Sequence, residues 1–364
     1  YASWGSIPAS TRQVAMTYDA SGDATGIYPF TLLVQNKYAS GSYDATVSDT
    51  LIVVNRAQSE FGAGWSLIGV EQLVLAQPGN KILWVGGDGS AGVYRNVATN
   101  VWQAAAGGFR DTLRYDPGTL TYTRTLRHGI QVKFDAQGRH IKTINRIGQT
   151  STFTWTGSPA RLTSIQVPPG GGGTTYVLQY DGNGKLDRIT DPTGRVLDAT
   201  VVTGQLTNLT DPDNYSTGFG YDGAARMTSR TTRRGFATKY VYAKNLRVTQ
   251  VRIPLDPATA DTAITNYTPW DERGLAFGTG VQTAIDTAVS YTKIDGPRSV
   301  PDTVVVRVDR WGAAAMITDP LGNVTSIARG DAVVPAAVSQ VTYPNGRILK
   351  LSWDARRNLT QTRD

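Results

Sequence analysis

The sequence predicts an all-β fold in which part of a sandwich is followed by a long sheet built from repeats, and three observations support this. A phrase of an aromatic residue, Asp, any two residues and Gly recurs along the chain. Glycine accounts for 39 of the 364 residues, which suits a chain with many turns. The 17 Tyr and 8 Trp residues favour packed β-structure over a solvated tail.

The recurring phrase has a loose but persistent spacing. Its clear and worn copies are Tyr18-Asp19…Gly22, Phe134-Asp135…Gly138, Tyr180-Asp181…Gly184, Tyr221-Asp222, Trp270-Asp271…Gly274, Val308-Asp309…Gly312 and Trp353-Asp354. From Phe134 onward the gaps between copies are 46, 41, 49, 38 and 45 residues. Recurrence at periods of roughly 20–50 residues indicates a repeat architecture.

Each copy has a physical interpretation as a strand end followed by a turn. The aromatic residue ends a strand and is expected to stack between neighbouring turns. Asp accepts hydrogen bonds from backbone amides two residues on, and Gly supplies the positive φ of a tight turn. A second turn phrase starts with Asp-Pro, where Pro presets φ at the second position. It occurs as Asp191-Pro192-Thr193-Gly194, Asp211-Pro212-Asp213-Asn214 and Asp319-Pro320-Leu321-Gly322. Each repeat is therefore expected to hold two short strands and two turns.

Three segments are predicted. Residues 1–57 are interpreted as the C-terminal part of an immunoglobulin-like or fibronectin-like β-sandwich, because three or four strands are too few for a complete one. Residues 58–125 form a junction at which the repeat sheet starts. Residues 126–364 hold about five repeats, and the last ends part-way through a unit, so the repeats are expected to continue beyond the chain.

Several longer motifs carry a resemblance to a known family. They are Phe61-Gly62-Ala63-Gly64-Trp65, Leu83-Trp84-Val85-Gly86-Gly87-Asp88-Gly89-Ser90, Phe134-Asp135-Ala136-Gln137-Gly138-Arg139 and Tyr180-Asp181-Gly182-Asn183-Gly184-Lys185-Leu186. Over roughly residues 58–364 the chain resembles the RHS/YD-repeat family. The resemblance implies a sheet wound into a hollow shell or solenoid. Bacterial members often enclose a C-terminal toxin, and animal relatives carry the shell on cell-surface adhesion proteins.

The resemblance does not extend to self-cleavage. In toxin-bearing members the shell ends in a motif rich in Asp-Pro-x-Gly, whose aspartates cut the toxin free. Asp319-Pro320-Leu321-Gly322 lacks the extended flanking pattern and is interpreted as a repeat turn.

Catalytic and metal-binding patterns are weak. The chain has no Cys, which excludes disulfides and thiolate chemistry. Its two histidines, His128 and His140, come without a Gly-x-Ser-x-Gly motif. The Gly182–Lys185 segment is followed by Leu186, whereas a phosphate-binding loop needs Ser or Thr there. We therefore expect no enzyme activity, cofactor or metal. A β-rich hydrolase that uses His128 or His140 stays open as an alternative.

Positive charge is concentrated in one stretch. It comprises Arg226, Arg230, Arg233, Arg234, Lys239, Lys244, Arg247 and Arg252, with no Asp or Glu between them, in a chain of net charge +7. Three interpretations compete: a solvated outer face, a basic inner wall that contacts cargo, and a surface for a polyanion. Nucleic acid is not the expected partner.

The predicted function is structural. We expect a shell segment of a larger, secreted or surface-exposed bacterial protein that encloses, displays or delivers a polypeptide such as a toxin domain. The expected partners are this cargo and neighbouring segments of the parent chain. The alternative is an adhesion module for glycans or proteins, with Trp102, Trp155 and Trp270 as candidate anchors. An uncapped last repeat also favours homo-assembly through sheet edges. No apolar run approaches 18 residues, so no transmembrane helix is expected.

Overall fold

The computed structural model describes the chain except for residues 1–11, 17, 39, 105–110, 169–173, 244–246, 256–261, 269–280, 286–289, 299 and 310. Every regular element of the described residues is a β-strand, which confirms the predicted all-β class. The chain forms two compact units. The first unit comprises residues 20–216, and the second comprises residues 1–19 and 217–364.

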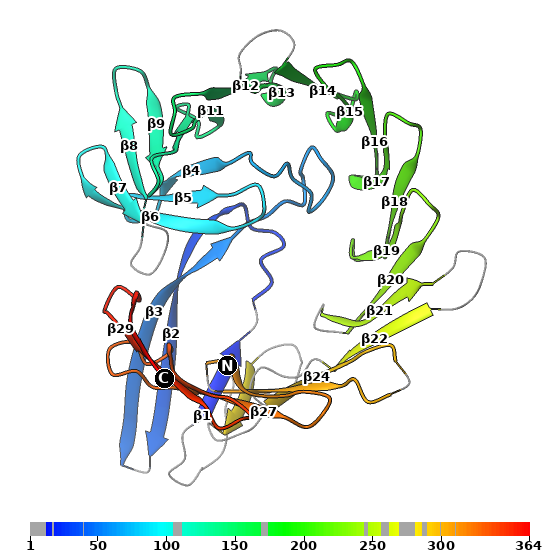
Figure 1. Ribbon diagram of the computed structural model, residues 1–364. Helices are drawn as coiled ribbons and strands as arrows, with labels where there is room; N and C mark the ends of the chain where they lie inside the picture. The colour runs from blue at the N-terminus through cyan, green and yellow to red at the C-terminus, as the bar shows by residue number, and fades with distance from the viewer. Residues whose placement is uncertain are drawn as a thin grey trace. The chain divides into compact units, whose positions relative to one another are not determined.

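The first unit holds a hairpin and a long antiparallel sheet (Figure 1). The hairpin consists of β2 (Gly26–Tyr38) and β3 (Gly41–Val53). In the sheet each strand pairs with the next along the chain. Its strands are β4 (Gln72–Gln77), β5 (Lys81–Val85), β6 (Ala91–Ala98), β7 (Val101–Ala104), β8 (Thr112–Asp116), β9 (Thr121–Thr125), β10 (Gln131–Phe134), β11 (His140–Ile144), β12 (Thr150–Thr156), β13 (Arg161–Gln166), β14 (Thr175–Tyr180), β15 (Leu186–Thr190), β16 (Val196–Val202) and β17 (Gln205–Thr210).

The second unit continues the same pattern of antiparallel neighbours. Its sheet strands are β18 (Ser216–Tyr221), β19 (Met227–Thr231), β20 (Ala237–Tyr242), β21 (Val248–Pro254), β22 (Thr262–Thr268), β24 (Ser290–Asp295), β25 (Val304–Val308), β26 (Ala314–Thr318), β27 (Val324–Arg329), β28 (Val338–Thr342), β29 (Ile348–Trp353) and β30 (Leu359–Arg363). A separate pair joins β1 (Arg12–Met16) to β23 (Val281–Ile285).

The sandwich expected for residues 1–57 is not confirmed. Three strands form in this segment, but β2 and β3 make a two-stranded sheet of their own. The other strand, β1, pairs with β23, which comes from far along the chain. The predicted boundaries of the junction and of the repeats stay predictions.

One turn geometry recurs along both units. In the turn that starts at Asp181, Oδ1 accepts hydrogen bonds from Asn183 N at 2.9 Å and Lys185 N at 2.8 Å, while Gly184 has a φ of 73°. The same pair of bonds, to the second and fourth residues on, is made by Asp135, Asn145, Asp191, Asp211, Asp222, Asp309, Asp319 and Asp354. The aromatic-Asp and Asp-Pro phrases therefore build the same turn.

These hydrogen bonds favour the ionised carboxylate. The Thr193 hydroxyl and nearby amides lower the pKa of Asp191, and the Arg226 amide lowers that of Asp222. In the Asp319 turn the pKa is lowered mainly by the Asn323 side chain. The turns need a side-chain oxygen that accepts two hydrogen bonds at their first position, and either Asp or Asn supplies it.

A β-bulge accompanies the turns at Asp135, Asp181, Asp222, Asp309 and Asp354, whereas the turns at Asn145, Asp191 and Asp319 join strands in regular register. Tyr180 pairs with Leu186 and Gln179 with Arg188, so Asp187 is the extra residue. The same shift of register lies beside Phe134, Trp155, Val201, Tyr221, Tyr242, Val308, Arg329 and Trp353. Since a bulge bends its strand and increases the local twist, a regular series of bulges curves a sheet.

The sheet of the first unit is apolar on one face and polar on the other. Directly opposed residues share a face. The apolar face, over β12–β17, carries Phe153, Trp155, Leu162, Ile165, Leu178, Tyr180, Leu186, Ile189, Leu197, Ala199, Val201, Leu206 and Leu209. The opposite face carries polar pairs such as Arg188 with Asp198 and Thr200 with Asn208. This alternation is typical of a sheet with one face turned to an apolar interior.

The turn geometry predicts the effect of removing one acceptor. Asp181→Ala leaves the amides of Asn183 and Lys185 without their acceptor, so we expect a loss of about 1–2 kcal/mol in the free energy of unfolding, by analogy with helix N-caps. Urea denaturation measures it. The control Asp187→Ala removes an exposed carboxylate three residues beyond the Asp181–Gly184 turn and should change stability by less than about 0.5 kcal/mol. Equal effects of the two variants would contradict the role given to Asp181.

Candidate functional site at the closed end of the sheet

Strands β4–β10 curl until the first strand returns to the β10–β11 turn, and we call this part the closed curl. Leu73 N donates to Gly138 O at 2.8 Å, and Gln72 and Arg139 form an isolated bridge. The curl is filled. Its core consists of Leu73, Ile82, Trp84, Tyr94, Trp102, Leu113, Val132 and Phe134. The sheet therefore begins with a packed end and no exposed first edge at Leu73.

A buried charge network lies inside the closed curl. Arg124 contacts Glu71 at 2.8 Å and Asp111 at 2.5 Å, and its guanidinium lies 4.1 Å from the centre of the Trp84 ring. Tyr94 donates to Asp111 at 3.2 Å, and its burial raises the pKa of the phenol. Asp111 Oδ1 is buried and has no hydrogen-bond partner among the described residues. Two carboxylates thus share one guanidinium.

Sequence reasoning missed this network. A signal was present, because Arg124 lies opposite Leu113 on one neighbouring strand and Val132 on the other, in an apolar row. Period-two alternation from Tyr122 places Arg124 on the same face as an aromatic residue. The partners of Arg124 come from segments 13 and 53 residues away, which no local pattern connects.

His140 is buried where the closed curl meets the rest of the sheet, at the start of β11. Its ring stacks on Phe153 at 3.9 Å between centroids and tilts against Phe134. Nδ1 accepts from Glu71 N at 3.2 Å, so the proton of the neutral ring is on Nε2, which lies 2.8 Å from Thr143 Oγ1. Burial lowers the pKa of His140 to about 4. This histidine is a packing residue at neutral pH.

Residues 56–66, which we call the strap, lie against the apolar face of the sheet. Leu186 N donates to Glu60 O at 2.8 Å, and Ala63 N donates to Gly204 O at 2.7 Å. Lys185 Nζ adds a bond of 2.8 Å to Ser59 O. A Cβ on Gly62 would lie 2.7 Å from Leu206 N, and Gly62 has a φ of +103°. Only glycine therefore fits at this closest approach.

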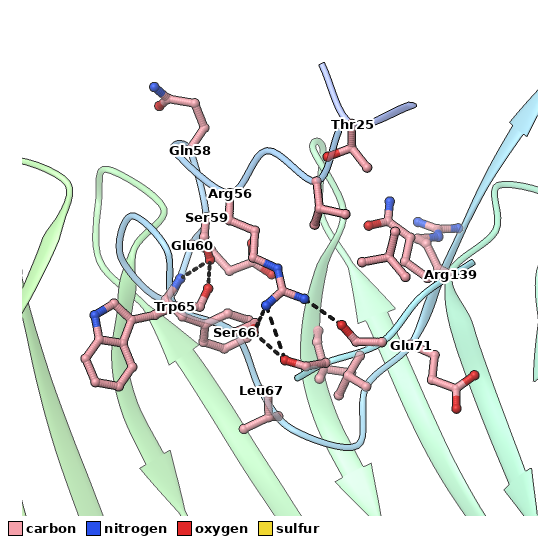
Figure 2. A pocket seen from close by; sticks show the side chains of 18 of the residues that line it. Thr25, Arg56, Gln58, Ser59, Glu60, Trp65, Ser66, Leu67, Glu71 and Arg139 are labelled. Atoms are coloured by element: carbon pink, nitrogen blue, oxygen red, sulfur yellow. Dashed lines mark hydrogen bonds between the residues drawn. The ribbon is translucent and has the colours of Figure 1, made fainter. Parts of the chain in front are cut away.

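Arg56 links the strap to the β5–β6 turn, as Figure 2 shows. Its guanidinium donates to Ser66 Oγ at 2.5 Å and to Gly86 O at 2.6 Å. A Cβ on Gly87 would lie 2.3 Å from Leu67 O. Arg56 and Ser66 flank the Phe61–Trp65 motif, and Gly86 belongs to the Leu83–Ser90 motif. This contact therefore joins the two motifs that were most specific in the sequence.

A cavity of about 550 Å³ lies between the strap and the sheet (Figure 2). Its lining includes Arg56, Glu71, Arg139, Trp155 and Leu162. Two of the charged side chains are engaged: Arg139 pairs with Asp135 at 2.6 Å, and Glu71 accepts from the Trp84 indole at 2.7 Å. The strap and the closed curl together form the candidate site, because they close one end of the apolar face.

The predicted basic residues do not converge on one site. Arg230, Arg233, Arg234, Lys239, Arg247 and Arg252 are exposed, and Lys244 lies outside the described residues. Arg226 is half-buried, pairs with Asp222 and lies 5.2 Å from the Tyr242 ring centre. Lys239 and Arg252 are directly opposed on β20 and β21 and share a face, whereas Arg230 faces the other way. Whether any of them contacts cargo or a polyanion stays a prediction.

The structure also places the histidines and the tryptophans that the sequence offered as candidate functional residues. His128 is exposed and His140 is packed between aromatic rings. Of the proposed glycan anchors, Trp102 is buried, Trp155 donates its indole N–H to His140 O, and Trp270 lies outside the described residues. In the described part of the chain, no three His, Cys, Asp or Glu side chains are grouped to hold a metal. Nor does that part contain a helix that could span a membrane.

Comparison with known proteins agrees with the repeat interpretation. Residues 202–237, which contain β17, β18 and β19, match the family model described as RHS Repeat. This confirms the resemblance to the RHS repeat family. The RHS repeat is a structural unit, and the matched residues include the turn at Asp211 and the turn at Asp222. No curated protein matches the sequence.

The chain is also similar to solved structures of Tc toxin components. One is TcdB2-TccC3 without its hypervariable C-terminal region, at 12% identity over 79% of this chain with a TM-score of 0.38. Another is the Tc holotoxin pore of Photorhabdus luminescens, with the same identity, coverage of this chain and TM-score. The chain covers 19% and 20% of these two solved chains, about a fifth of their length.

The buried network predicts a large effect of removing its cation. Arg124→Met leaves Glu71 and Asp111 as unpaired charges in the core, so we expect a loss of about 3–5 kcal/mol in the free energy of unfolding. The control is Arg188→Met, since Arg188 pairs with Asp198 at 2.8 Å on an exposed face, where a pair contributes less than about 1 kcal/mol. Urea denaturation followed by Trp fluorescence measures the loss of unfolding free energy in both variants. Similar losses in Arg124→Met and Arg188→Met would contradict the role given to the buried network.

His140 predicts a pH dependence with a defined window. Its pKa is about 4 in the folded chain and about 6.5 when unfolded, so the unfolded state binds the extra proton first on acidification. The stabilisation by neutral His140 is complete above pH 6.5 and is lost as the pH falls towards 4, by up to about 3 kcal/mol.

The urea midpoint measured between pH 7.5 and 4.5 checks this. His140→Phe should remove most of the slope in that window, because the turn carboxylates with a lowered pKa, such as Asp191, Asp222 and Asp319, titrate below it. The exposed His128 provides the control, and His128→Phe should leave the slope unchanged. A slope that survives His140→Phe would be incompatible with the assignment.

Proposed function

We propose that the chain is a wall segment of an RHS-type shell that encloses or delivers a polypeptide, with a toxin domain as the expected cargo. One observation carries the proposal: the sheet has a continuous apolar face, and that face is closed at one end by a filled curl and a strap. A wall of this kind needs no catalytic group. Its function is to separate what lies on its apolar side from water.

The chemistry of the two faces supports this use. On β12–β17 the apolar face is formed by large aliphatic and aromatic residues, with Leu162, Leu178, Leu186 and Leu206 buried. The backbone polar groups are paired in the antiparallel ladder, so the wall leaves few unsatisfied donors or acceptors towards an interior. An apolar wall suits a polypeptide whose own apolar side chains are exposed.

The proposed partners are polypeptide cargo and neighbouring segments of the parent chain. A secreted or surface-exposed bacterial protein is the proposed setting, on the strength of the RHS repeat. The adhesion alternative is weaker for glycans, because Trp102 is buried and Trp155 is engaged by the backbone.

The proposal is tested on the intact parent protein by site-specific photo-crosslinking. A benzophenone amino acid in place of Ile189 lies on the apolar face, and the same group in place of Arg188 lies on the polar face. We expect the Ile189 probe to react with a polypeptide segment other than the strap, identified by mass spectrometry, and the Arg188 probe not to do so. Equal labelling from both positions, or none from Ile189, would exclude containment on this face.

Cryo-electron microscopy of the same particle provides an independent readout. Density for a second polypeptide against the apolar face would agree with a shell. A sheet stacked on identical copies without a lumen would instead show a structural assembly.

A further inference from the structure

In five of the described hairpins that carry a bulge, a single hydrogen bond links the hairpin to the one before it. The donor is the side chain at the bulge, and the acceptor is the backbone carbonyl of the residue that pairs with the preceding bulge. The bonds are Trp155 Nε1 to His140 O at 2.7 Å, Tyr180 Oη to Leu162 O at 2.7 Å, Tyr242 Oη to Met227 O at 2.7 Å, Arg329 Nη1 to Ala314 O at 2.8 Å and Trp353 Nε1 to Val338 O at 2.7 Å.

These aromatic residues therefore have a role that the sequence did not predict. Their polar atoms donate to the backbone carbonyl of the residue that is paired at the preceding bulge. Four of the five donors lie 15 residues after their acceptor, although one of these four is an arginine. The link thus depends on a long side chain with a donor at its tip, and an aromatic ring is only one way to supply it.

Val201 lies inside this series, between Tyr180 and Tyr242, but has no donor. Phe134 and Val308 also have none, but the strand pair before each of them lacks this shift of register. Val201 lies at a bulge, pairs with Leu206, and follows the hairpin in which Tyr180 pairs with Leu186. By the rule above, its acceptor would be Leu186 O, which is again 15 residues earlier. Valine has no donor and cannot reach this carbonyl.

The strap lies at this same hairpin. Its Glu60 carbonyl accepts from Leu186 N, its Ala63 amide donates to Gly204 in the β16–β17 turn, and Gly62 lies against Leu206. Val201 and Leu206 are directly opposed, so Val201 is on the face that the strap covers. A polypeptide segment therefore lies where the long side chain is missing.

We propose that Val201 marks a docking seat for a polypeptide segment, which this chain fills with its own strap. The seat takes a glycine-containing segment in a tight loop that offers one carbonyl to Leu186 N and one amide to Gly204 O. An aliphatic residue at position 201 selects the segment, whereas a Tyr or Trp there would extend towards Leu186 and occupy its space. This inference concerns the chain alone and is independent of cargo containment.

The closing experiment compares two variants of the full chain by hydrogen exchange with mass spectrometry. Val201→Tyr supplies the missing long side chain and should expose the strap, so exchange at the Ala63 amide should rise about tenfold or more as its bond to Gly204 is lost. Val202→Tyr is the matched control, because Val202 is the next residue, 49% exposed, and its alternation places it on the other face. It should leave exchange in the strap unchanged.

The results separate the alternatives. Faster exchange over residues 58–66 in Val201→Tyr alone supports the seat. Unchanged exchange in Val201→Tyr, or an equal rise in Val202→Tyr, overturns it.

A second variant serves if Val201→Tyr fails to fold. Gly62→Val leaves the sheet sequence intact but conflicts with Leu206, so the Leu186 amide should lose protection while Ile189 keeps it. A synthetic peptide of residues 58–66 in excess should then restore protection at Leu186. The same peptide with the Gly62→Val change should not. Failure of the unmodified peptide to restore protection would overturn the assignment of a docking seat.

Discussion

An Asp or Asn side chain that accepts two backbone amides is the interaction on which the rest of this structure depends. It closes a turn of four residues, the last of which is in the left-handed region, as Gly184 and Gly322 are, so that each strand reverses into its neighbour at once. With Asp181 and Asp319 as examples, the same geometry serves an aromatic-Asp phrase and an Asp-Pro phrase. Because the turn is local, it can be repeated without a shared core.

A sheet made only of such turns would be a flat ribbon with open edges, and two further devices change this. The bulges beside turns such as the one at Asp181 add a residue on one strand and bend the sheet. In the closed curl, the free edge of β4 is paired with the β10–β11 turn, and aromatic and aliphatic side chains fill the inside. Curvature thus comes from the repeat, and closure comes from a non-repeating segment.

Buried polarity is concentrated at this closed end. Arg124 with two carboxylates and neutral His140 between rings are both costly to bury without partners, and both have partners only in the folded curl. Such groups specify one arrangement of strands more than they add stability. The strap then extends the closed end along the apolar face, where valine at position 201 leaves room for it.

The sequence by itself determined the all-β class, the repeat and the chemistry of the turns, because period-two alternation and the Asp turn act within a few residues. It did not determine the pairing of β1 with β23, the partners of Arg124 or the position of the strap, since these contacts join segments tens to hundreds of residues apart. The Phe61–Trp65 motif was recognised in the sequence, but the need for glycine at Gly62 follows only from its close approach to Leu206, which the tertiary structure provides.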